Sequence, residues 1–494
     1  MGYNHKYEAT KGHQPEPFFY WFGEVSACPR PSGNEKALIE YLKDFAEKRN
    51  LPCDVDEAGN VFITVPGTEG YEDYPAFLIQ GHMDIVPVKD EGVEFDFDTQ
   101  PINLTLGEDK IYAPGTTLGA DNGVAIATML ALADSMADEP IPHVPLELLF
   151  TVEEETGMKG IKRFDCSKIT ARRMLNCDSG DPHRVAVCCG GNSKSKIEKK
   201  YEVSPVEEGW TALHINLTGG LGGHSGGMIN KGRACAANNM GELLTALMED
   251  ENVPEFRISS IKSGMPSIIK TCEAVIAVPA AAAQSAVQCM DERFALIKDI
   301  YKNSDPGLKL EVKEIAGDHL TAISGEDSEK VAQCLLFLET AMYRSHYQYT
   351  QAPVTGGSIG YVELTPEGKF NVDFSVRSSI NEDLRLKFKK YVLKMKLLGL
   401  DLVEYDAWCG WVEEPVSPLR DTLLSLHMEM FGEEMVTGRG IGGIEVGAIK
   451  TAIPDMDAVA FAPYSTGAHT TNEHLVISKV APFWELMKKL IISK

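Results

Sequence analysis

The sequence has few basic residues for its length, no long uninterrupted apolar run and no paired pattern of cysteines. Among its 494 residues, 47 are Lys or Arg and 72 are Asp or Glu, which gives a formal net charge of −25. Such an acidic chain lacks the basic surface that non-specific nucleic-acid binding requires, and anionic membrane surfaces repel it. We therefore expect no nucleic acid and no membrane among its partners.

No segment combines the length and apolarity of a membrane span. The most apolar stretch, residues 274–287, is interrupted by Pro279 and Gln284 and is shorter than the roughly 20 residues that a span needs. The N-terminal sequence MGYNHKYEAT has no basic region followed by an apolar core, so no secretory signal is expected. The 11 scattered cysteines favour reduced, buried thiols of a cytoplasmic protein over a disulfide framework.

Helical and strand patterns alternate over the first 190 residues, which predicts an α/β sheet flanked by helices. Strands are expected at residues 76–80, 146–152 and 174–177, and an apolar helix at residues 123–136. Ser32 and Glu35 have the spacing of a capping box before another helix. The pattern changes near residue 190 and resumes after a βα-rich stretch. We predict one α/β domain from residues 1–190 and 412–494, with an α+β domain inserted at residues 191–411.

Polar residues stand where the predicted strands stop. His82 and Asp84 follow the first strand, Glu154 and Glu155 the second, and Asp178 the third. In open α/β sheets, functional sites form outside the carboxyl ends of the strands. These side chains are therefore expected at one edge of the sheet.

A mixed set of imidazole and carboxylate ligands suits Zn²⁺, with Mn²⁺ and Co²⁺ as substitutes. Two metals about 3.5–4 Å apart need a bridging carboxylate, ligands of their own and an open position for water. Five candidate ligands meet this requirement if Asp121 is shared: His82, Asp121, Glu155, Asp178 and His469. Asp84 can accept a hydrogen bond from the His82 nitrogen that faces away from the metal. Glu154 can take a proton from a metal-bound water and pass it to a leaving amine.

Each of these signals is weak alone. The run Glu153, Glu154 and Glu155 is also typical of a solvated acidic turn. Asp121 or Asn122 could instead cap the helix that follows. Jointly, the segments GHMDIVP, TLGADNG, EEETG, NCDSG and GAHTTNE resemble, in this order, the aminoacylase/carboxypeptidase family of dinuclear zinc peptidases. The match covers essentially the whole chain and is most similar to the Xaa-His (aminoacyl-histidine) dipeptidase branch.

The resemblance implies a zinc-peptidase catalytic domain with an inserted lid domain that carries a homodimer contact. It implies one metal held by His82 and Asp178 and a second held by Glu155 and His469, with Asp121 between them. It also implies that Glu154 is the general base and acid, and that Asp84 orients His82.

Three further residues match functional positions of the family. The resemblance implies that His224, in the glycine-rich loop 222–226, helps to stabilise the oxyanion. It implies that Arg377 receives the substrate carboxylate, although a solvated strand arginine is the alternative. It places Glu445 near the substrate amino group. Ile441 stands where the branch has His, and residues 267–271 lack the usual lid Asn, so the preferred side chain of the substrate stays open.

The sequence thus predicts a cytoplasmic, dimeric dipeptidase with two Zn²⁺ ions. It would hydrolyse small dipeptides, Xaa-His peptides among them, by a metal-bridged hydroxide with Glu154 as the base. One alternative is an N-acyl amino-acid deacylase of the same family. Another is a non-catalytic binding protein on this scaffold, which retention of all five ligands and of Glu154 disfavours.

Overall fold

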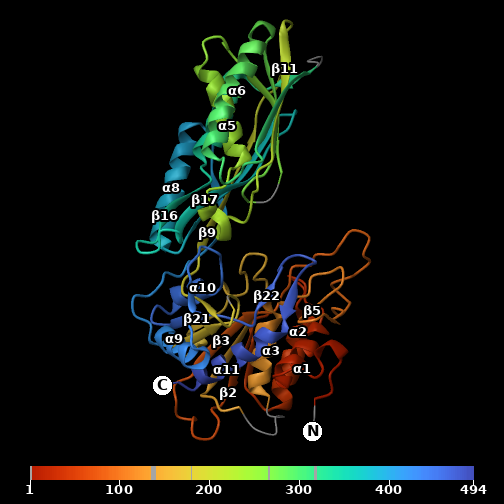
Figure 1. Cartoon of the computed structure of the whole chain (residues 1–494), viewed down its shortest axis with the longest axis vertical. Coiled ribbons are helices and arrows are strands. Elements are labelled where there is room, and N and C mark those ends of the chain that lie inside the picture. The colour runs from red at the N-terminus through yellow and green to blue at the C-terminus, as the bar shows by residue number, and fades with distance from the viewer. Residues whose placement is uncertain (1–2, 135–140, 180, 265–266, 316–319, 494) are drawn as a thin grey trace. The chain divides into compact units, whose positions relative to one another are not determined.

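The computed structural model describes residues 3–134, 141–179, 181–264, 267–315 and 320–493. The chain forms two compact units, coloured by residue number in Figure 1. Unit 1 comprises Met1–Cys188, Val412–Arg439 and Ile444–Lys494, and unit 2 comprises Cys189–Trp411 and Gly440–Gly443. The short segment Gly440–Gly443 belongs to unit 2, which the division predicted from the sequence did not include.

Unit 1 is built on a mixed eight-stranded sheet. Its strand order is β1 (Cys53–Val55), β2 (Val61–Val65), β6 (Leu146–Thr151), β3 (Phe77–His82), β7 (Arg173–Asn176), β21 (Asp457–Ala460), β8 (Arg184–Ala186) and β20 (Val436–Gly438). Strand β3 runs parallel to both β6 and β7, and all residues of β3 and β6 are buried. Such nearly continuous apolar strands are typical of a sheet that is covered on both faces. The predicted α/β fold is confirmed, and the sheet is mixed.

In the part of the chain that the structure describes, unit 1 also contains six helices, several of which contact this sheet. They are α1 (Glu16–Ser26), α2 (Lys36–Lys48), α3 (Ala120–Ala133), α9 (Pro418–Phe431), α10 (Val446–Ala452) and α11 (Val480–Ile491), with short 3₁₀ turns η1 (Glu8–Thr10), η2 (Cys166–Lys168) and η5 (Ile477–Lys479). Helix α2 contacts β1 and β2, α3 contacts β3 and α1, and α9 contacts β21 and α11. Helix α3 begins three residues earlier than predicted, and residues 135 and 136 of that prediction lie outside the described residues. A small sheet joins β22 (Ser465–Thr466), β23 (His474–Val476), β5 (Lys110–Tyr112) and β4 (Thr105–Leu106).

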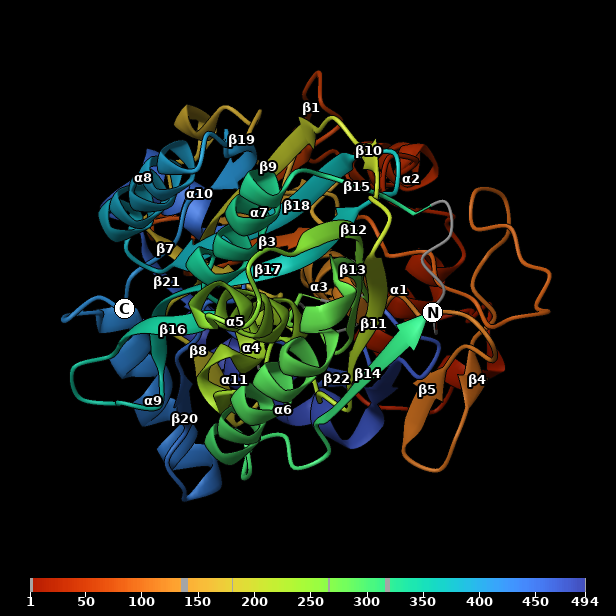
Figure 2. The ribbon, with the colours of Figure 1, turned by 90° about the horizontal axis from the view of Figure 1, so that it is seen from above.

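Unit 2 contains helices and a nine-stranded sheet. The strand order is β14 (Lys309–Ile315), β11 (Trp210–Thr218), β13 (Cys272–Pro279), β12 (Arg257–Ser263), β17 (Pro353–Leu364), β18 (Lys369–Ser378), β9 (Gly191–Lys200) and β19 (Val403–Trp408), with β16 (Ala341–Ser345) paired to β17. The long helices α5 (Ala236–Glu249), α6 (Ala283–Ile300), α7 (Gly325–Phe337) and α8 (Asn381–Leu397) lie over this sheet (Figure 2). The remaining elements are α4 (Ser225–Met228), η3 (Ile229–Lys231), η4 (Ala280–Ala282) and the paired strands β10 (Ser204–Pro205) and β15 (Thr321–Ala322).

The alternating residues of β18 show how the sequence directs this packing. Phe370, Val372, Phe374 and Val376 are buried in the core of unit 2, whereas Asp373 of the same strand is exposed. Alternate side chains of a strand point to opposite faces, so one face packs against helices and the other is polar. Among the described residues, no helix is long and apolar enough to cross a membrane.

Two sequence predictions need correction. Ser32 and Glu35 do not form a capping box, because no side chain caps α2 and both side chains bond elsewhere. Ser32 donates to Asp84, and Glu35 accepts from the backbone N–H groups of Gly33 and Glu153. The cysteines are not uniformly buried either: five are buried, but Cys53 is exposed.

Candidate metal centre

The carboxyl ends of three parallel strands bring the predicted side chains to one edge of the unit 1 sheet. His82 is the last residue of β3 and pairs in register with Thr151, the last residue of β6. Glu154 and Glu155 follow β6 within four residues, and Asp178 follows β7 by two. The parallel register explains why residues almost 100 positions apart in the sequence meet here.

His82 faces two carboxylates that come from different segments. Its Nε2 atom lies 3.1 Å from Oδ1 of Asp121 and 3.7 Å from Oδ1 of Asp178. His82 is only 1% exposed. One imidazole nitrogen and two carboxylate oxygens lie within 4.8 Å of one another, which is the donor set of a divalent-metal site.

The second oxygen of Asp121 faces a different group. Its Oδ2 atom lies 3.3 Å from Nε2 of His469, and the same nitrogen lies 2.8 Å from Oε1 of Glu155. Asp121, Glu155 and His469 therefore form a second group of donor atoms within 4.8 Å of one another. Because the two groups share Asp121 through opposite oxygens, this carboxylate has the arrangement that a bridging ligand needs.

Asp84 holds the backbone of the acidic segment as well as facing His82. The Nδ1 atom of His82 lies 3.4 Å from Oδ1 of Asp84 and 3.1 Å from its backbone oxygen. The Asp84 carboxylate also accepts bonds from the backbone N–H groups of Glu154, at 2.9 Å, and Glu155, at 3.1 Å. Ser32 donates to the same carboxylate at 2.7 Å. Asp84 thus links the strand that carries His82 to the turn that carries both glutamates.

Two buried residues that the sequence analysis missed hold the Asp121 loop. The Glu473 carboxylate accepts bonds from the backbone N–H groups of Leu118, Gly119 and Asp121, at 2.8, 2.8 and 3.0 Å. Arg30 donates to the carbonyl oxygens of Met83 and Gly119, at 2.8 and 2.6 Å, and so ties the two motif loops together. Glu473 was visible in the GAHTTNE segment, but no sequence signal marked Arg30.

The backbone of this loop is unusual. Gly119 has φ 72°, in the left-handed region that glycine adopts without strain. A Cβ atom at this position would lie 2.8 Å from the Ile85 side chain and 2.9 Å from Arg30. Asp121 and Asn122 have non-helical dihedral angles although they lie in the first turn of α3. The loop can therefore turn the Asp121 side chain toward both histidines.

Burial makes this group of acids electrostatically unfavourable without a cation. Burial raises the pKa of Asp178 to about 7, and it raises the pKa of Glu154 well above its ordinary value, helped by neighbouring Asp178 and Glu445. For Asp121, hydrogen bonds from His469 and His82 outweigh the opposing effect of burial and hold the pKa well below its usual range. A divalent cation would supply the positive charge that lets all these carboxylates ionise together. The donor set and its electrostatics therefore fit bound metal.

A cavity of about 150 Å³ opens beside these residues. Asp121, Asp178 and Ser465 line it together with Asn122. Asn122 is 1% exposed, and neither polar atom of its side chain has a hydrogen-bond partner among the described residues. The cavity offers space for a small substrate group next to the shared carboxylate.

Glu445 lies against the strands that carry the site and is fully buried. Thr151 donates to its carboxylate at 2.5 Å, and Gln80 donates to the same oxygen. Burial raises its pKa to about 8. The other oxygen of this carboxylate, Oε1, is buried and has no hydrogen-bond partner among the described residues, and its expected contact with a substrate amino group stays a prediction.

His224 and Arg377 belong to unit 2, whereas the candidate metal ligands belong to unit 1. His224 is exposed in the turn that begins α4, and the neighbouring Ser225 lies 3.2 Å from Nε of Arg377. The guanidinium of Arg377 also lies 5.8 Å from the centre of the Trp408 ring, and burial lowers its pKa to about 10. The structure thus brings Arg377 to the glycine-rich loop of His224.

Comparisons with known proteins identify a peptidase family. The sequence profile described as "Peptidase family M20/M25/M40" matches residues 78–493. The "Cytosol non-specific dipeptidase" of Escherichia coli K12 is 27% identical over 484 residues, which cover 97% of each chain.

Solved structures of two dipeptidases are also similar to this chain. The aminoacylhistidine dipeptidase from Vibrio alginolyticus matches with a TM-score of 0.85 and 26% identity, over 98% of this chain and 97% of that one. The di-peptidase Dug1p from Saccharomyces cerevisiae matches with a TM-score of 0.51 and 14% identity, over 96% of this chain and 95% of that one, and shows likeness of fold alone.

Proposed function

Because the chain belongs to the peptidase family M20/M25/M40, we propose that it is a metal-dependent dipeptidase that hydrolyses the amide bond of small dipeptides. The observation that carries the proposal is the Asp121 carboxylate, which offers one oxygen toward His82 and the other toward His469. The names of the two full-length relatives, from Escherichia coli and Vibrio alginolyticus, support the substrate class. The cavity of about 150 Å³ beside Asp121 supports a small substrate.

Two Zn²⁺ ions are the proposed cofactors, and Mn²⁺ or Co²⁺ are possible substitutes. His82 and Asp178 would hold one ion, Glu155 and His469 would hold the other, and Asp121 would contact both. When bound, such ions polarise a carbonyl oxygen and lower the pKa of water.

Glu154 is the proposed general base and acid. Its backbone N–H donates to Asp84. One donor atom each of Glu154, His82 and Glu155 lie within 4.8 Å of one another. Burial raises the pKa of the Glu154 carboxyl group above the ordinary value, which favours uptake of a proton by the carboxylate before the proton passes to the leaving amine. Asp84 holds the Glu154 peptide and the His82 ring in the orientation that this transfer needs.

Unit 2 is proposed to act as a lid and as the contact surface of a homodimer. His224 would donate to the oxyanion that forms on the substrate carbonyl. Arg377 would bind the substrate carboxylate, since a guanidinium that is largely removed from water pairs strongly with an anion. The name of the Escherichia coli relative supports a cytosolic location.

The test is hydrolysis of a substrate panel by protein loaded with Zn²⁺, Mn²⁺ or Co²⁺. The panel contains β-Ala-His, Gly-His, dipeptides without histidine and N-acetyl amino acids. We expect dipeptides to be cleaved and N-acetyl amino acids to be poor substrates. Comparison of the His-containing and His-free peptides then defines which substrate side chain the enzyme prefers. The sequence leaves this preference open, because Ile441 and residues 267–271 differ from the Xaa-His dipeptidase branch.

The variant Glu154→Gln separates catalysis from metal binding. It should keep its metal and lose about 10²–10⁴-fold in kcat, the contribution of a positioned acid–base group. The matched control is Glu153→Gln, whose side chain pairs with Lys159 at 2.6 Å instead of facing the candidate ligands. Failure of the metal-loaded wild type to cleave any dipeptide, or full activity of Glu154→Gln, would contradict the proposal.

A further inference from the structure

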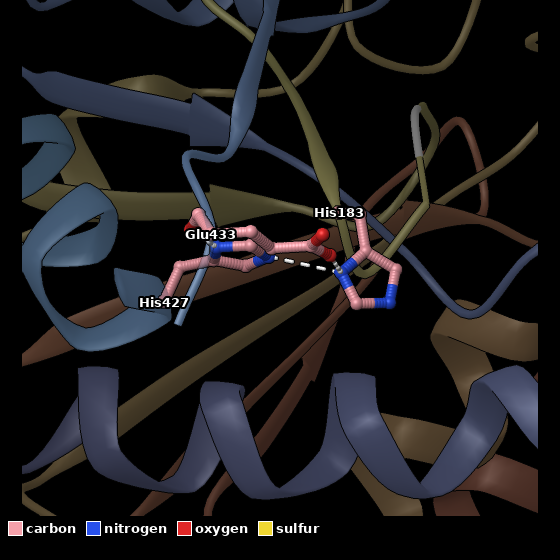
Figure 3. Close-up of side chains that lie close together, drawn as sticks. All are labelled: His183, His427 and Glu433. Carbon is pink, nitrogen blue, oxygen red and sulfur yellow. Dashed lines mark hydrogen bonds and ion pairs between the residues drawn. The ribbon is translucent and has the colours of Figure 1, made fainter. Parts of the chain in front are cut away.

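A second group of metal-ligand side chains lies in unit 1 and shares no residue with the candidate metal centre. It consists of His183, His427 and Glu433. His427 lies in the last turns of α9, Glu433 follows that helix by two residues, and His183 immediately precedes β8. Figure 3 shows the three side chains pointing toward one another.

The distances between the donor atoms approach those of a tetrahedral metal site. Nδ1 of His183 lies 3.0 Å from Nε2 of His427 and 3.3 Å from Oε1 of Glu433. Ligands bound to zinc at about 2.0–2.1 Å in a tetrahedron lie roughly 3.3 Å from one another. All three donor atoms lie within 4.8 Å of one another, so a small shift of side chains would admit an ion.

The two imidazoles are held so that Nδ1 of His183 and Nε2 of His427 face each other. Nδ1 of His427 lies 2.9 Å from the backbone carbonyl oxygen of Glu433, which can only accept a bond. In the neutral ring, Nδ1 therefore carries the proton, and Nε2 presents its lone pair toward His183. The Phe431 ring packs against both imidazoles, with centroids 5.0 Å from His183 and 4.8 Å from His427.

The backbone that carries these side chains is also anchored. The His183 N–H donates to Asp181 at 2.7 Å, and its carbonyl oxygen accepts from Val436 of β20 at 2.9 Å. His427 is fully buried, whereas the side chains of His183 and Glu433 are 29% and 63% exposed. The group is thus rigid on its inner side and open to solvent on its outer side, where water could complete a coordination shell.

We propose that His183 Nδ1, His427 Nε2 and Glu433 Oε1 bind one Zn²⁺ ion at a structural site separate from the candidate metal centre. Two imidazoles and one carboxylate are the ligand types that zinc and cobalt accept. The ion would tie the end of α9 to His183, which immediately precedes β8. It would therefore stabilise this junction without touching substrate.

The test is zinc stoichiometry after loading and dialysis, measured by elemental mass spectrometry. Wild-type protein should retain one more zinc per chain than His183→Gln and than Glu433→Gln, both of which change exposed or partly exposed side chains. Glu434→Gln, at the exposed neighbouring position, is the matched control and should retain the wild-type number. Dipeptide hydrolysis by His183→Gln should equal that of the wild type.

A variant that lacks the candidate metal centre makes the zinc-binding test independent of the proposed function. The double variant Asp121→Ala, His469→Ala lacks the shared carboxylate. Zinc should still bind to the group of His183, His427 and Glu433 in this variant. Co²⁺ bound there should give visible d–d absorption, which should be lost when His183→Gln is added. If zinc content and Co²⁺ absorption are the same with and without His183→Gln, the group is an imidazole pair joined by a hydrogen bond, and the proposal is overturned.

Discussion

The carboxylate of Glu473 should control metal affinity although it touches no candidate ligand side chain. It accepts three backbone N–H groups of the loop that carries Asp121, and it is 2% exposed. In Glu473→Gln, the amide oxygen can keep the two bonds to Leu118 and Gly119. The amide nitrogen then faces the N–H of Asp121, so that donor loses its acceptor.

The magnitude follows from that lost bond. A hydrogen bond to a charged acceptor contributes about 1.5–3 kcal/mol, and every 1.4 kcal/mol corresponds to about a tenfold change in affinity. If the Asp121 peptide moves away from its present position, zinc affinity should fall about 10–100-fold, as for other residues that orient metal ligands. The assay is competition for zinc with a chelator of known affinity, together with the free energy of unfolding.

Glu147→Gln is the matched control. Glu147 lies near the start of β6, is 4% exposed, and accepts the backbone N–H groups of Thr170 and Ala171 at 2.9 and 3.1 Å. It should lose a similar free energy of unfolding and keep its zinc affinity. Equal zinc affinities for Glu473→Gln, Glu147→Gln and the wild type would refute the reasoning.

Three more outcomes are expected. Arg377→Lys should raise KM about 10–100-fold for a dipeptide with a free carboxylate, because a lysine cannot form the two parallel bonds of a guanidinium. KM for the same dipeptide with an amidated C-terminus should stay unchanged. Equal effects on both substrates would count against binding of the substrate carboxylate by Arg377. Burial lowers the pKa of His143 in the folded state, so the unfolded chain binds the proton first as the pH falls. The free energy of unfolding should therefore decrease below about pH 6.5, by at most about 1.4 kcal/mol per pH unit. Urea unfolding of His143→Gln should show a shallower dependence on pH than that of the wild type. Zinc at a hundredfold excess over its Kd should raise the free energy of unfolding by about 2.7 kcal/mol relative to chelator-treated protein, and an unchanged Tm would contradict binding to the folded state.

The positions of several candidate ligands could be predicted where a local pattern and a strand end coincide. His82, Glu155 and Asp178 could be placed at one sheet edge because each follows an apolar strand that must be buried. Asp121 lies between Gly119 and Gly123 in the sequence, and Gly119 has a positive φ in the structure. These predictions depend only on the period of the side chains and on the direction of parallel strands.

Residues that act through long-range hydrogen bonds could not be found in this way. Arg30 bonds the carbonyl oxygens of Met83 and Gly119, which lie 53 and 89 positions further along the chain. Ser32 fits a local capping pattern, yet it donates to Asp84, 52 positions away. A tertiary bond to a buried carboxylate competes with a local cap and replaces it here, and no local pattern reports the presence of that partner.

The central claim is that residues from distant parts of the chain hold two ions around one shared carboxylate. Anomalous diffraction at the zinc edge from zinc-loaded crystals tests it most directly. The account predicts two peaks about 3.5–4 Å apart, one beside His82 and Asp178 and one beside Glu155 and His469, with Asp121 in contact with both. A single peak, or peaks that do not contact Asp121, would contradict it.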